Sequence, residues 1–195
     1  MTNKVSAILL AAGLSARMGE DKLFLKYNGK SFLQNTINML IELHVFERII
    51  VTTDTRQKQV SIPNAIKVCI NPYPEKGISS SIKSGVEAAT GTHYLFLAAD
   101  QPLLTTNDLQ PLLDAVDKNP EKIIFPVIYL KPSSPTIFPS VFKEQLKKLC
   151  GDNGGRVIRE AHRDLWYTIQ PVNPNNFSDI DSAQDYNRMK GYVKP

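Results

Sequence analysis

The sequence predicts an α/β fold in which a mostly parallel sheet lies between two layers of helices, as a three-layer sandwich. Three observations support this: short apolar runs recur along the chain, longer segments with helical spacing separate them, and the two kinds alternate. Continuous apolar runs are typical of strands buried on both faces of a parallel sheet, and intervening helices indicate βαβ crossovers. At 195 residues, a single domain over residues 1–195 is expected. The predicted strands are residues 5–10, 48–53, 66–70, 94–98 and 123–127.

Three predicted helices separate these strands. Ser31 and Gln34 form a capping box at the start of the first helix, and Gly91 is placed to end the second. Apolar residues three and four positions apart give each helix one buried face. These stripes are Leu33, Ile37, Leu40 and Ile41, then Ile78, Ile82, Val86 and Ala89, then Leu109, Leu112, Leu113 and Val116.

The alternation weakens after Val127. Residues 130–140 contain Pro132, Pro135 and Pro139, which predict a loop or an excursion at the edge of the sheet. Beyond them we expect a helix over 141–150 ended by Gly151, a short helix over 156–162, a strand over 165–169 and a last helix over 183–190.

The composition favours small anionic ligands over nucleic acids or membranes. Lys and Arg outnumber Asp and Glu by 23 to 19, which gives a net charge of +4, but the basic residues are scattered. No apolar run approaches the roughly 20 residues of a membrane span. The first run leads into a charged loop as a strand would, so a cytoplasmic protein is expected. Cys69 and Cys150 lack metal-ligand spacing and are expected to be reduced thiols.

The run LAAGLSARMGEDK, residues 10–22, follows the first predicted strand. Gly13 allows the backbone to approach a ligand closely, and Arg17 and Lys22 can form charge-assisted bonds to phosphate oxygens. The run matches neither the dinucleotide fingerprint nor the P-loop. Two interpretations remain open at this point: a polyphosphate-binding loop, or an ordinary strand-to-helix turn with two solvated cations.

Acidic residues follow predicted strands at two further places. Asp100 ends the strand over 94–98, and ligands of open α/β sheets bind outside the carboxyl ends of strands. Asp179 and Asp181 flank Ile180, so they share a face of an extended segment. Asp100 with one of them could hold Mg²⁺, which prefers carboxylate and phosphate oxygens. The alternative is that Asp100, and Asp181 or Ser182, only cap the helices that follow.

The segment over residues 71–85 is rich in proline and then in serine. Serine hydroxyls and the free amides of a first helical turn could bind a base, a ribose or a phosphate. Alternatively, Ser79 only caps the helix.

Taken together, these segments resemble the molybdenum cofactor nucleotidyltransferases, the MobA-like NTP transferase family. Residues 10–22 resemble the signature loop of the family, L-A-[AG]-G-x-S-x-R-M-G-x-x-K. The resemblance continues in the same order through residues 77–85, 97–104, 150–156 and 179–186 and covers nearly the whole chain. It implies a Rossmann-like nucleotidyltransferase fold.

The sequence resembles in particular the cytidylyltransferase branch, which converts molybdopterin cofactor to its cytosine dinucleotide form. The guanylyl branch typically carries Gly where this chain has Ala12, and it lacks the G-x-S-S-S segment. The resemblance therefore implies CTP rather than GTP as donor, molybdopterin as acceptor and pyrophosphate as the leaving group. A molybdenum hydroxylase apoenzyme is the implied partner.

By position, the resemblance implies a role for each matched residue. Lys22, Arg17 and Asp100 would carry the catalysis, with the two cations neutralising the triphosphate. Ala12 would help to select the base. Mg²⁺ would be held by Asp100, with Asp181 as the second ligand. The nucleotide would contact Leu10, Ala11, Ala12, Gly13, Gly77, Ser79, Ser80 and Ser81, and the acceptor would contact Asp152 and Arg156.

The chain departs from the family pattern at residues 130–135, which read LKPSSP where a glycine-containing stretch is usual. If this loop contacts the acceptor, an altered acceptor is expected while the nucleotide chemistry is retained. Other functions stay open: nucleotidyl transfer that uses GTP or another acceptor such as a sugar phosphate, and a non-catalytic protein that delivers cofactor to a molybdenum hydroxylase.

Overall fold

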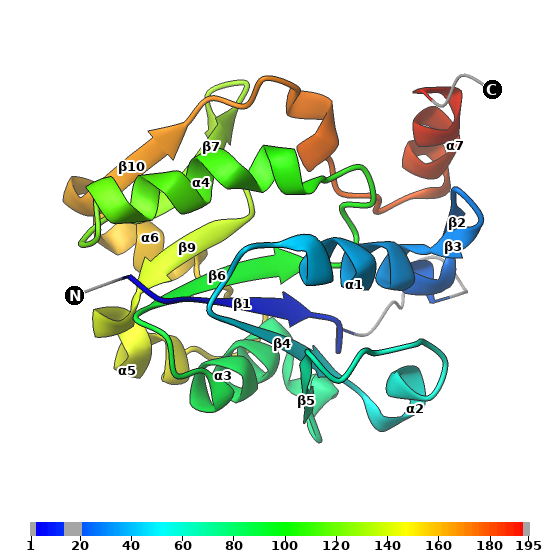
Figure 1. Ribbon diagram of the computed structural model, residues 1–195, viewed down its shortest axis with the longest axis horizontal. Helices are drawn as coiled ribbons and strands as arrows, with labels where there is room; N and C mark the ends of the chain where they lie inside the picture. Colours follow the sequence, from blue (N-terminus) through cyan, green and yellow to red (C-terminus); the bar gives the residue numbers. More distant parts are fainter. Residues whose placement is uncertain (1–2, 14–20, 193–195) are drawn as a thin grey trace.

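The computed structural model describes residues 3–13 and 21–192, and one large twisted sheet crosses it from side to side (Figure 1). The strands of this sheet are β1 (Val5–Leu10), β4 (Glu47–Thr52), β5 (Lys67–Ile70), β6 (His93–Ala98), β7 (Ile123–Ile128), β8 (Lys131–Pro132), β9 (Thr136–Pro139) and β10 (Trp166–Ile169). Their order is β10-β7-β9-β6-β1-β4-β5, with β8 paired to β7 outside that order. β1 runs parallel to β4 and β6, β4 to β5, and β10 to β7, whereas β9 runs antiparallel to both neighbours.

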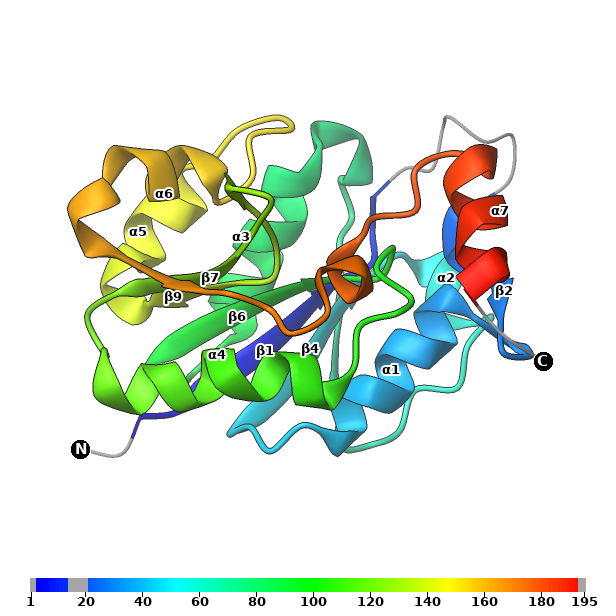
Figure 2. The same ribbon diagram turned by 90° about the horizontal axis from the view of Figure 1, so that it is seen from above.

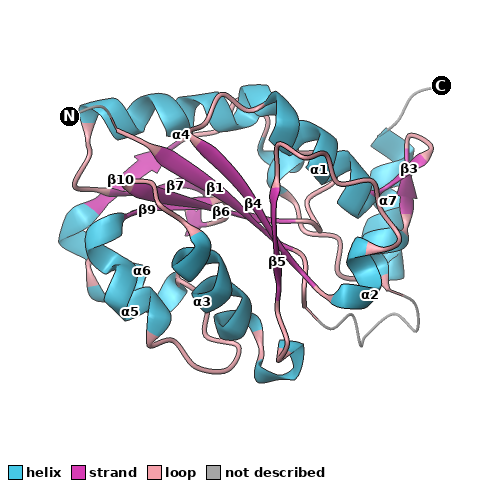
Figure 3. Ribbon diagram, turned by 60° about the horizontal axis from the view of Figure 1, so that its bottom comes forward, coloured by secondary structure: helices cyan, strands magenta, loops and turns pink. Residues whose placement is uncertain are grey.

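Helices cover both faces of this sheet, as the three-layer prediction requires (Figure 3). The helices are α1 (Phe32–Glu42), α2 (Asp54–Gln57), α3 (Ile78–Ala88), α4 (Thr106–Lys118), α5 (Lys143–Lys147), α6 (Arg156–Ala161) and α7 (Ala183–Tyr192). The 3-10 turns include η1 (Lys22–Phe24), η2 (Pro74–Lys76), η3 (Ser140–Phe142), η4 (Arg163–Leu165) and η5 (Pro174–Phe177), and β2 (Lys26–Tyr27) and β3 (Lys30–Ser31) form a separate hairpin. α1 and α4 lie on one face of the sheet, and α3 and α5 lie on the other.

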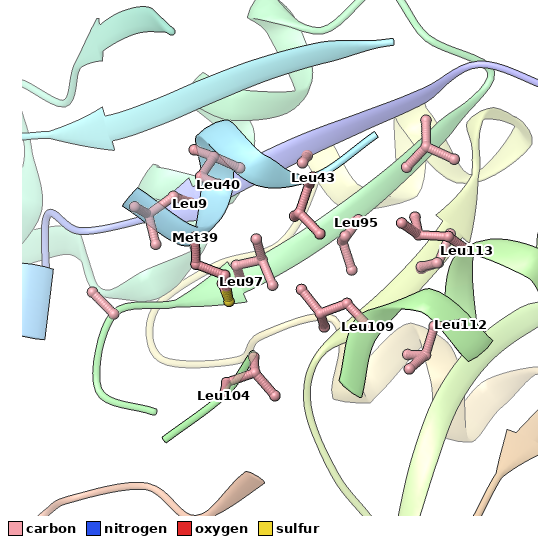
Figure 4. Close-up of a cluster of buried hydrophobic side chains, with 14 of the residues drawn as sticks. Leu9, Met39, Leu40, Leu43, Leu95, Leu97, Leu104, Leu109, Leu112 and Leu113 are labelled. Atoms are coloured by element: carbon pink, nitrogen blue, oxygen red, sulfur yellow. The ribbon is translucent and has the colours of Figure 1, made fainter. Parts of the chain in front are cut away.

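Each face of the sheet has its own hydrophobic core. Alternate residues of β1 divide between them: Leu9 packs with α1 and α4, whereas Ile8 packs with α3. Figure 4 shows the first core, where leucines of β1 and β6 meet those of α1 and α4. Burial of this much apolar surface on both faces fixes the register of the central strands, and so fixes where each strand ends.

The carboxyl ends of β1, β4 and β6 lie at one edge of the sheet. The backbone there runs directly into the loop after Leu10 and the turn at Asp100. α7 and the β2–β3 hairpin lie together beyond this edge (Figure 2), joined by a 2.8 Å hydrogen bond from the Tyr186 hydroxyl to the Lys26 carbonyl. Among the described residues, no helix is both long and apolar enough to traverse a bilayer.

The prediction of a loop or edge excursion over residues 130–140 is wrong for its second half. β9 occupies the middle of the sheet between β6 and β7, with Ile137 and Phe138 buried. The prolines are compatible with this because Pro135 precedes the strand and Pro139 ends it. The amides of Thr136, Ile137 and Phe138 therefore remain available to the ladder.

Other expectations need smaller corrections. The helix expected over 141–150 is only η3 and the five residues of α5, and α3 ends at Ala88, before Gly91. Ser31 caps α1 by accepting from the Gln34 amide, but the Gln34 side chain bonds Ser61 and Asn38 instead of completing the box. β5 is an exposed edge strand, so burial on both faces does not hold there.

Candidate active site

A cavity of about 240 Å³ lies at the carboxyl edge of the sheet, where the loop after β1, the turn after β6 and the start of α3 converge. Two parallel neighbours, β1 and β6, deliver the first two segments to the same place because Leu10 pairs with Ala98. The lining includes Leu10, Gly13, Lys22, Gly77, Ser81, Ala98, Asp100 and Asp152. Residues predicted from four separate segments, or from their immediate surroundings, thus line one space.

Lys22 joins the two predicted carboxylates. Its Nζ lies 2.8 Å from Asp100 Oδ2 and 2.6 Å from Asp181 Oδ1. Lys22 begins η1, which Asp21 caps by accepting from the Leu23 amide. Burial lowers the pKa of Lys22, but the charges and hydrogen bonds of Asp100 and Asp181 outweigh burial and raise it overall. The ammonium is therefore charged at neutral pH.

Asp100 does not cap the following helix. Thr105 caps α4 in a complete capping box with Asp108, which leaves the Asp100 carboxylate directed to the site. Asp100 Oδ1 is buried and has no hydrogen-bond partner among the described residues. The Asp100 carbonyl accepts from the Ile180 amide at 2.9 Å, which brings the second acidic segment alongside the first. An orphaned buried carboxylate oxygen of this kind is suited to a cation.

Neither Asp179 nor Asp181 caps α7. Ser182 accepts from the Asp185 amide at the start of α7, and Asp185 accepts from the Ser182 amide. Asp179 is exposed to solvent and lines two cavities. Desolvation by the residues around it, together with the negative charges of Asp100 and Asp181, raises the pKa of Asp179 to about 6. The expectation that Ser182 caps the last helix is confirmed, whereas Asp100 and Asp181 cap no helix. The capping boxes at Thr105 and Ser182 are visible in the sequence and could have excluded a capping role for the two aspartates.

The loop after β1 is described only at its two ends. Arg17 lies outside the described residues, and Gly13 lines the cavity. Ala11 and Ala12 are fully buried, so any influence of Ala12 on the base would act through the position of the neighbouring backbone and not through contact.

Sequence reasoning missed Arg56, which ties both described ends of this loop together. Its Nε lies 2.6 Å from Asp21 Oδ2, and its Nη1 donates to the Ala11 carbonyl at 2.8 Å. Arg56 is 7% exposed, in the short helix α2. Its sequence context carries no local signal, because a charged residue after a strand ordinarily faces solvent.

The turn before α3 depends on Gly77. Its φ is +80°, and a Cβ there would lie 2.5 Å from Asp152 Oδ1 and 2.6 Å from the Gly151 carbonyl. The Ser79 amide donates to the Gly151 carbonyl at 3.1 Å, so residues 151–152 close over the start of the helix. Asp152 thereby borders the cavity that Lys22 and Asp100 also line.

The three serines of this turn divide between two sides of α3. Ser81 lines the cavity, whereas Ser79 and Ser80 line a separate groove together with Tyr73 and Cys150. No serine caps the helix, whose N-cap is Gly77. The buried Asn71, which the sequence analysis did not single out, donates to the Ser80 and Ser81 hydroxyls at 2.8 and 3.0 Å and holds the turn to the end of β5.

A second cleft of about 330 Å³ adjoins the first and shares Leu10, Ile78 and Ala98 with it. Its floor is apolar, and its polar residues include Ser133, Ser134, Arg156, Arg159 and Asp179. Arg156 and Asp152, the predicted acceptor residues, therefore line different but contiguous cavities.

Arg159 in this second cleft was not predicted. It is 7% exposed, its guanidinium carbon lies 4.6 Å from the Phe125 ring centroid, and its Nη1 donates to the Ser133 carbonyl at 3.3 Å. Burial lowers the pKa of Arg159, although the charge of Glu160, whose Oε1 lies 3.8 Å from Arg159 Nε, acts in the opposite direction. Arg156 and Arg159 both line the cleft and supply positive charge to it.

The fold and the site define a class of α/β proteins that bind a ligand at the carboxyl edge of a parallel sheet. Residues 7–165 match the MobA-like NTP transferase domain, and the chain belongs to this family of nucleotidyltransferases. The family membership and the fold predicted from the motifs are both confirmed.

Curated relatives carry several names. The chain is 24% identical to the molybdenum cofactor cytidylyltransferase of Escherichia coli, over 93% of each chain. It is 28% identical to a probable molybdenum cofactor guanylyltransferase of Natranaerobius thermophilus, over 66% of this chain and 62% of that one. It is 24% identical to the purine catabolism protein PucB of Bacillus subtilis, over 94% of each chain.

Solved structures share the fold. The Rv0371c protein of Mycobacterium tuberculosis superposes with a TM-score of 0.81 at 18% identity, covering 97% of this chain and 98% of that chain. The same protein has been solved in complex with manganese. A nucleotidyl transferase from Methanothermobacter thermautotrophicus gives a TM-score of 0.79 at 22% identity, covering 98% of both chains.

Proposed function

We propose that this chain transfers CMP from CTP to the terminal phosphate of molybdopterin and releases pyrophosphate. The observation that carries the proposal is the Lys22 ammonium between Asp100 and Asp181, at 2.8 and 2.6 Å, on the edge of a cavity at the carboxyl end of the sheet. A cation and two carboxylates meeting beside a glycine loop suit a metal-bound triphosphate better than a neutral ligand.

The carboxylates fit a divalent ion. Asp100 Oδ1 is a buried oxygen without a hydrogen-bond partner in the described chain, and Asp181 is exposed beside it. Residues 3–13 and 21–192 contain no group of three or more His, Cys, Asp or Glu side chains arranged to hold a metal. We therefore expect Asp100 and Asp181 to hold Mg²⁺ only together with phosphate oxygens of the nucleotide. When bound, the ion would neutralise phosphate charge.

The reaction needs little proton transfer, because the attacking phosphate of the acceptor is already ionised at neutral pH. One of its oxygens forms a bond to the α-phosphorus of CTP while the bond from that phosphorus to the bridging oxygen breaks, and pyrophosphate leaves with the electron pair. Lys22 and Arg17 would stabilise the charge on the triphosphate and the departing pyrophosphate. The work of the protein is thus positioning and charge stabilisation.

The nucleotide would occupy the 240 Å³ cavity, with Gly13, Gly77 and Ser81 on its walls. The acceptor would occupy the adjoining 330 Å³ cleft, where Arg156 and Arg159 supply positive charge and the apolar floor suits a flat ring system. Both substrates would thereby meet beside Asp100. We further propose that a molybdenum hydroxylase apoenzyme receives the product.

CTP is proposed over GTP because the chain carries Ala12 and the residues GISSS before α3, like the cytidylyltransferase branch. The relatives named above include enzymes named for either nucleotide, and a panel of nucleotides distinguishes the two.

The test is pyrophosphate release by the purified chain with purified molybdopterin and Mg²⁺, across CTP, GTP, ATP and UTP. We expect release with CTP, dependent on molybdopterin and abolished by chelation of divalent ions. Release only with GTP would overturn the nucleotide assignment, and release with a sugar phosphate in place of molybdopterin would overturn the acceptor. Nucleotide binding without release from any pair would make the chain a delivery protein instead of an enzyme.

A further inference from the structure

The hairpin between β7 and β8 has an unusual tip. Ile128 pairs with Lys131, so Tyr129 and Leu130 form a two-residue turn. Their φ angles are +49° and +64°, both in the left-handed region. Such turns ordinarily use Asn-Gly or Asp-Gly, because residues with a bulky side chain are strained there.

The chain gains little from its own contacts at this tip. Tyr129 is 77% exposed and Leu130 is 93% exposed. Tyr129 makes no hydrogen bond or ring contact with another described residue. A strained backbone that presents two large apolar side chains to solvent is destabilising for the free protein, and strain of this kind tends to occur where function requires it.

The tip lies on the side of the site assigned above to the acceptor. Tyr129 lines a cavity of about 290 Å³ together with Leu103, Asp179, Arg188 and Met189. Asp179 also lines the 330 Å³ cleft, to which the returning limb of the same hairpin contributes Pro132, Ser133 and Ser134. The hairpin therefore borders both cavities that meet at Asp179.

We propose that Tyr129 is the aromatic contact that selects the acceptor, whose class is a planar heteroaromatic ring carrying a phosphate ester. The inference rests on the proposed function and adds a specificity-determining residue to it. With the acceptor in the 330 Å³ cleft and its phosphate near Asp100, the far edge of its ring system passes Asp179 into the 290 Å³ cavity and packs on Tyr129. Met189 is a polarisable neighbour there and Arg188 a cation. Contact with the acceptor offsets the strain of the turn.

The test compares three variants with the wild-type chain. Tyr129→Ala is expected to raise the KM for molybdopterin about tenfold and leave the KM for CTP unchanged, and Tyr129→Phe is expected to behave as wild type. Replacing the turn by Asn-Gly (Tyr129→Asn with Leu130→Gly) is expected to raise the Tm, because the strain is relieved, and still to weaken acceptor binding. Val172→Ala, at a fully exposed apolar residue, is the control and should change neither constant.

If the tip has only a structural role, the Asn-Gly variant should combine a higher Tm with acceptor binding at least as tight as that of the wild type. That result, or an acceptor KM within twofold of wild type for Tyr129→Ala, overturns the inference. If the wild-type chain releases no pyrophosphate, the proposed function fails, and the Kd for molybdopterin measured by equilibrium dialysis on the same variants still decides the role of Tyr129.

Discussion

Lys22 Nζ lies 2.8 Å from Asp100 Oδ2, although the two residues are 78 positions apart in the chain. The contact exists because β1 and β6 are adjacent and parallel, with Leu10 opposite Ala98, so both strands release their next residues at the same edge. Asp181 also contacts Lys22, because the amide of the preceding residue, Ile180, donates to the Asp100 carbonyl and holds the two acidic segments side by side. Three distant segments thus meet through backbone geometry and not through sequence proximity.

Asp100→Asn is expected to lower kcat for pyrophosphate release by about 100-fold or more, because it removes a charge from the centre that stabilises the reacting phosphates. Circular dichroism and the Tm should show an intact fold. Asp114→Asn, at an exposed carboxylate on α4, is the matched control and should retain the wild-type rate. A near-normal rate for Asp100→Asn would remove this residue from the mechanism.

Gly77→Ala is expected to lower the free energy of unfolding by about 1–3 kcal/mol, because a Cβ at φ +80° is strained and overlaps Asp152 and the backbone of Gly151. It should also raise the KM for CTP, since residues 151–152 border the nucleotide cavity. Gly154→Ala is the control: its Cβ would meet only Ile78 Cγ2, at 3.8 Å. Urea unfolding and nucleotide titrations measure the two effects, and equal behaviour of both variants would contradict the role of Gly77.

Arg56→Lys is expected to cost about 1–3 kcal/mol of stability and to weaken CTP binding. A lysine cannot reproduce the two divergent bonds that the guanidinium makes to Asp21 and the Ala11 carbonyl. Arg163→Lys, at a residue whose side chain is 71% exposed and pairs with Glu160, should be neutral by comparison. Thermal unfolding with and without CTP separates the two effects. Unchanged CTP affinity in Arg56→Lys would show that the loop holds its position without this tie.

Asp179→Asn is expected to stabilise the protein at pH 8 by about 1 kcal/mol, a value that allows for solvent screening of this exposed side chain. Desolvation, Asp100 and Asp181 raise the pKa of Asp179 from 3.8 to about 6, so the folded state binds this proton more tightly than the unfolded state. The stability that the bound proton provides is complete below pH 3.8 and is lost as the pH rises through 6. The gain in Tm should therefore vanish near pH 3.5 when measured with EDTA present.

The opposite sign is expected at Asp54, which serves as the control. A hydrogen bond from Lys58 lowers the pKa of this exposed carboxyl, so Asp54→Asn should give no stabilisation at pH 8. Stabilisation by Asp179→Asn that persists unchanged to pH 3.5 would show that the effect is not electrostatic.

Local patterns were sufficient for the elements buried on both faces. β1 has the bounds that its apolar run predicts, and β4, β6 and β7 differ from prediction by one residue at one or both ends. Local patterns could not predict the central position of β9. The strand has only four residues, Pro135 precedes it and Pro139 ends it, and its pairing partners, β6 and β7, are separate segments of the chain. A proline excludes hydrogen bonding at its own nitrogen and says nothing about the next amide.

Periodicity, caps and motif residues are local properties of the sequence, and they were enough to predict the alternating α/β architecture, the family and the chemical character of the segments around the site. The folded arrangement was needed to show that Lys22 joins Asp100 and Asp181, that Arg56 and Arg159 are buried, and that Ala12 has no exposed surface. This is because burial and charge pairing depend on which strands become neighbours. That choice is made by the packing of two whole cores, and no single segment of the chain encodes it.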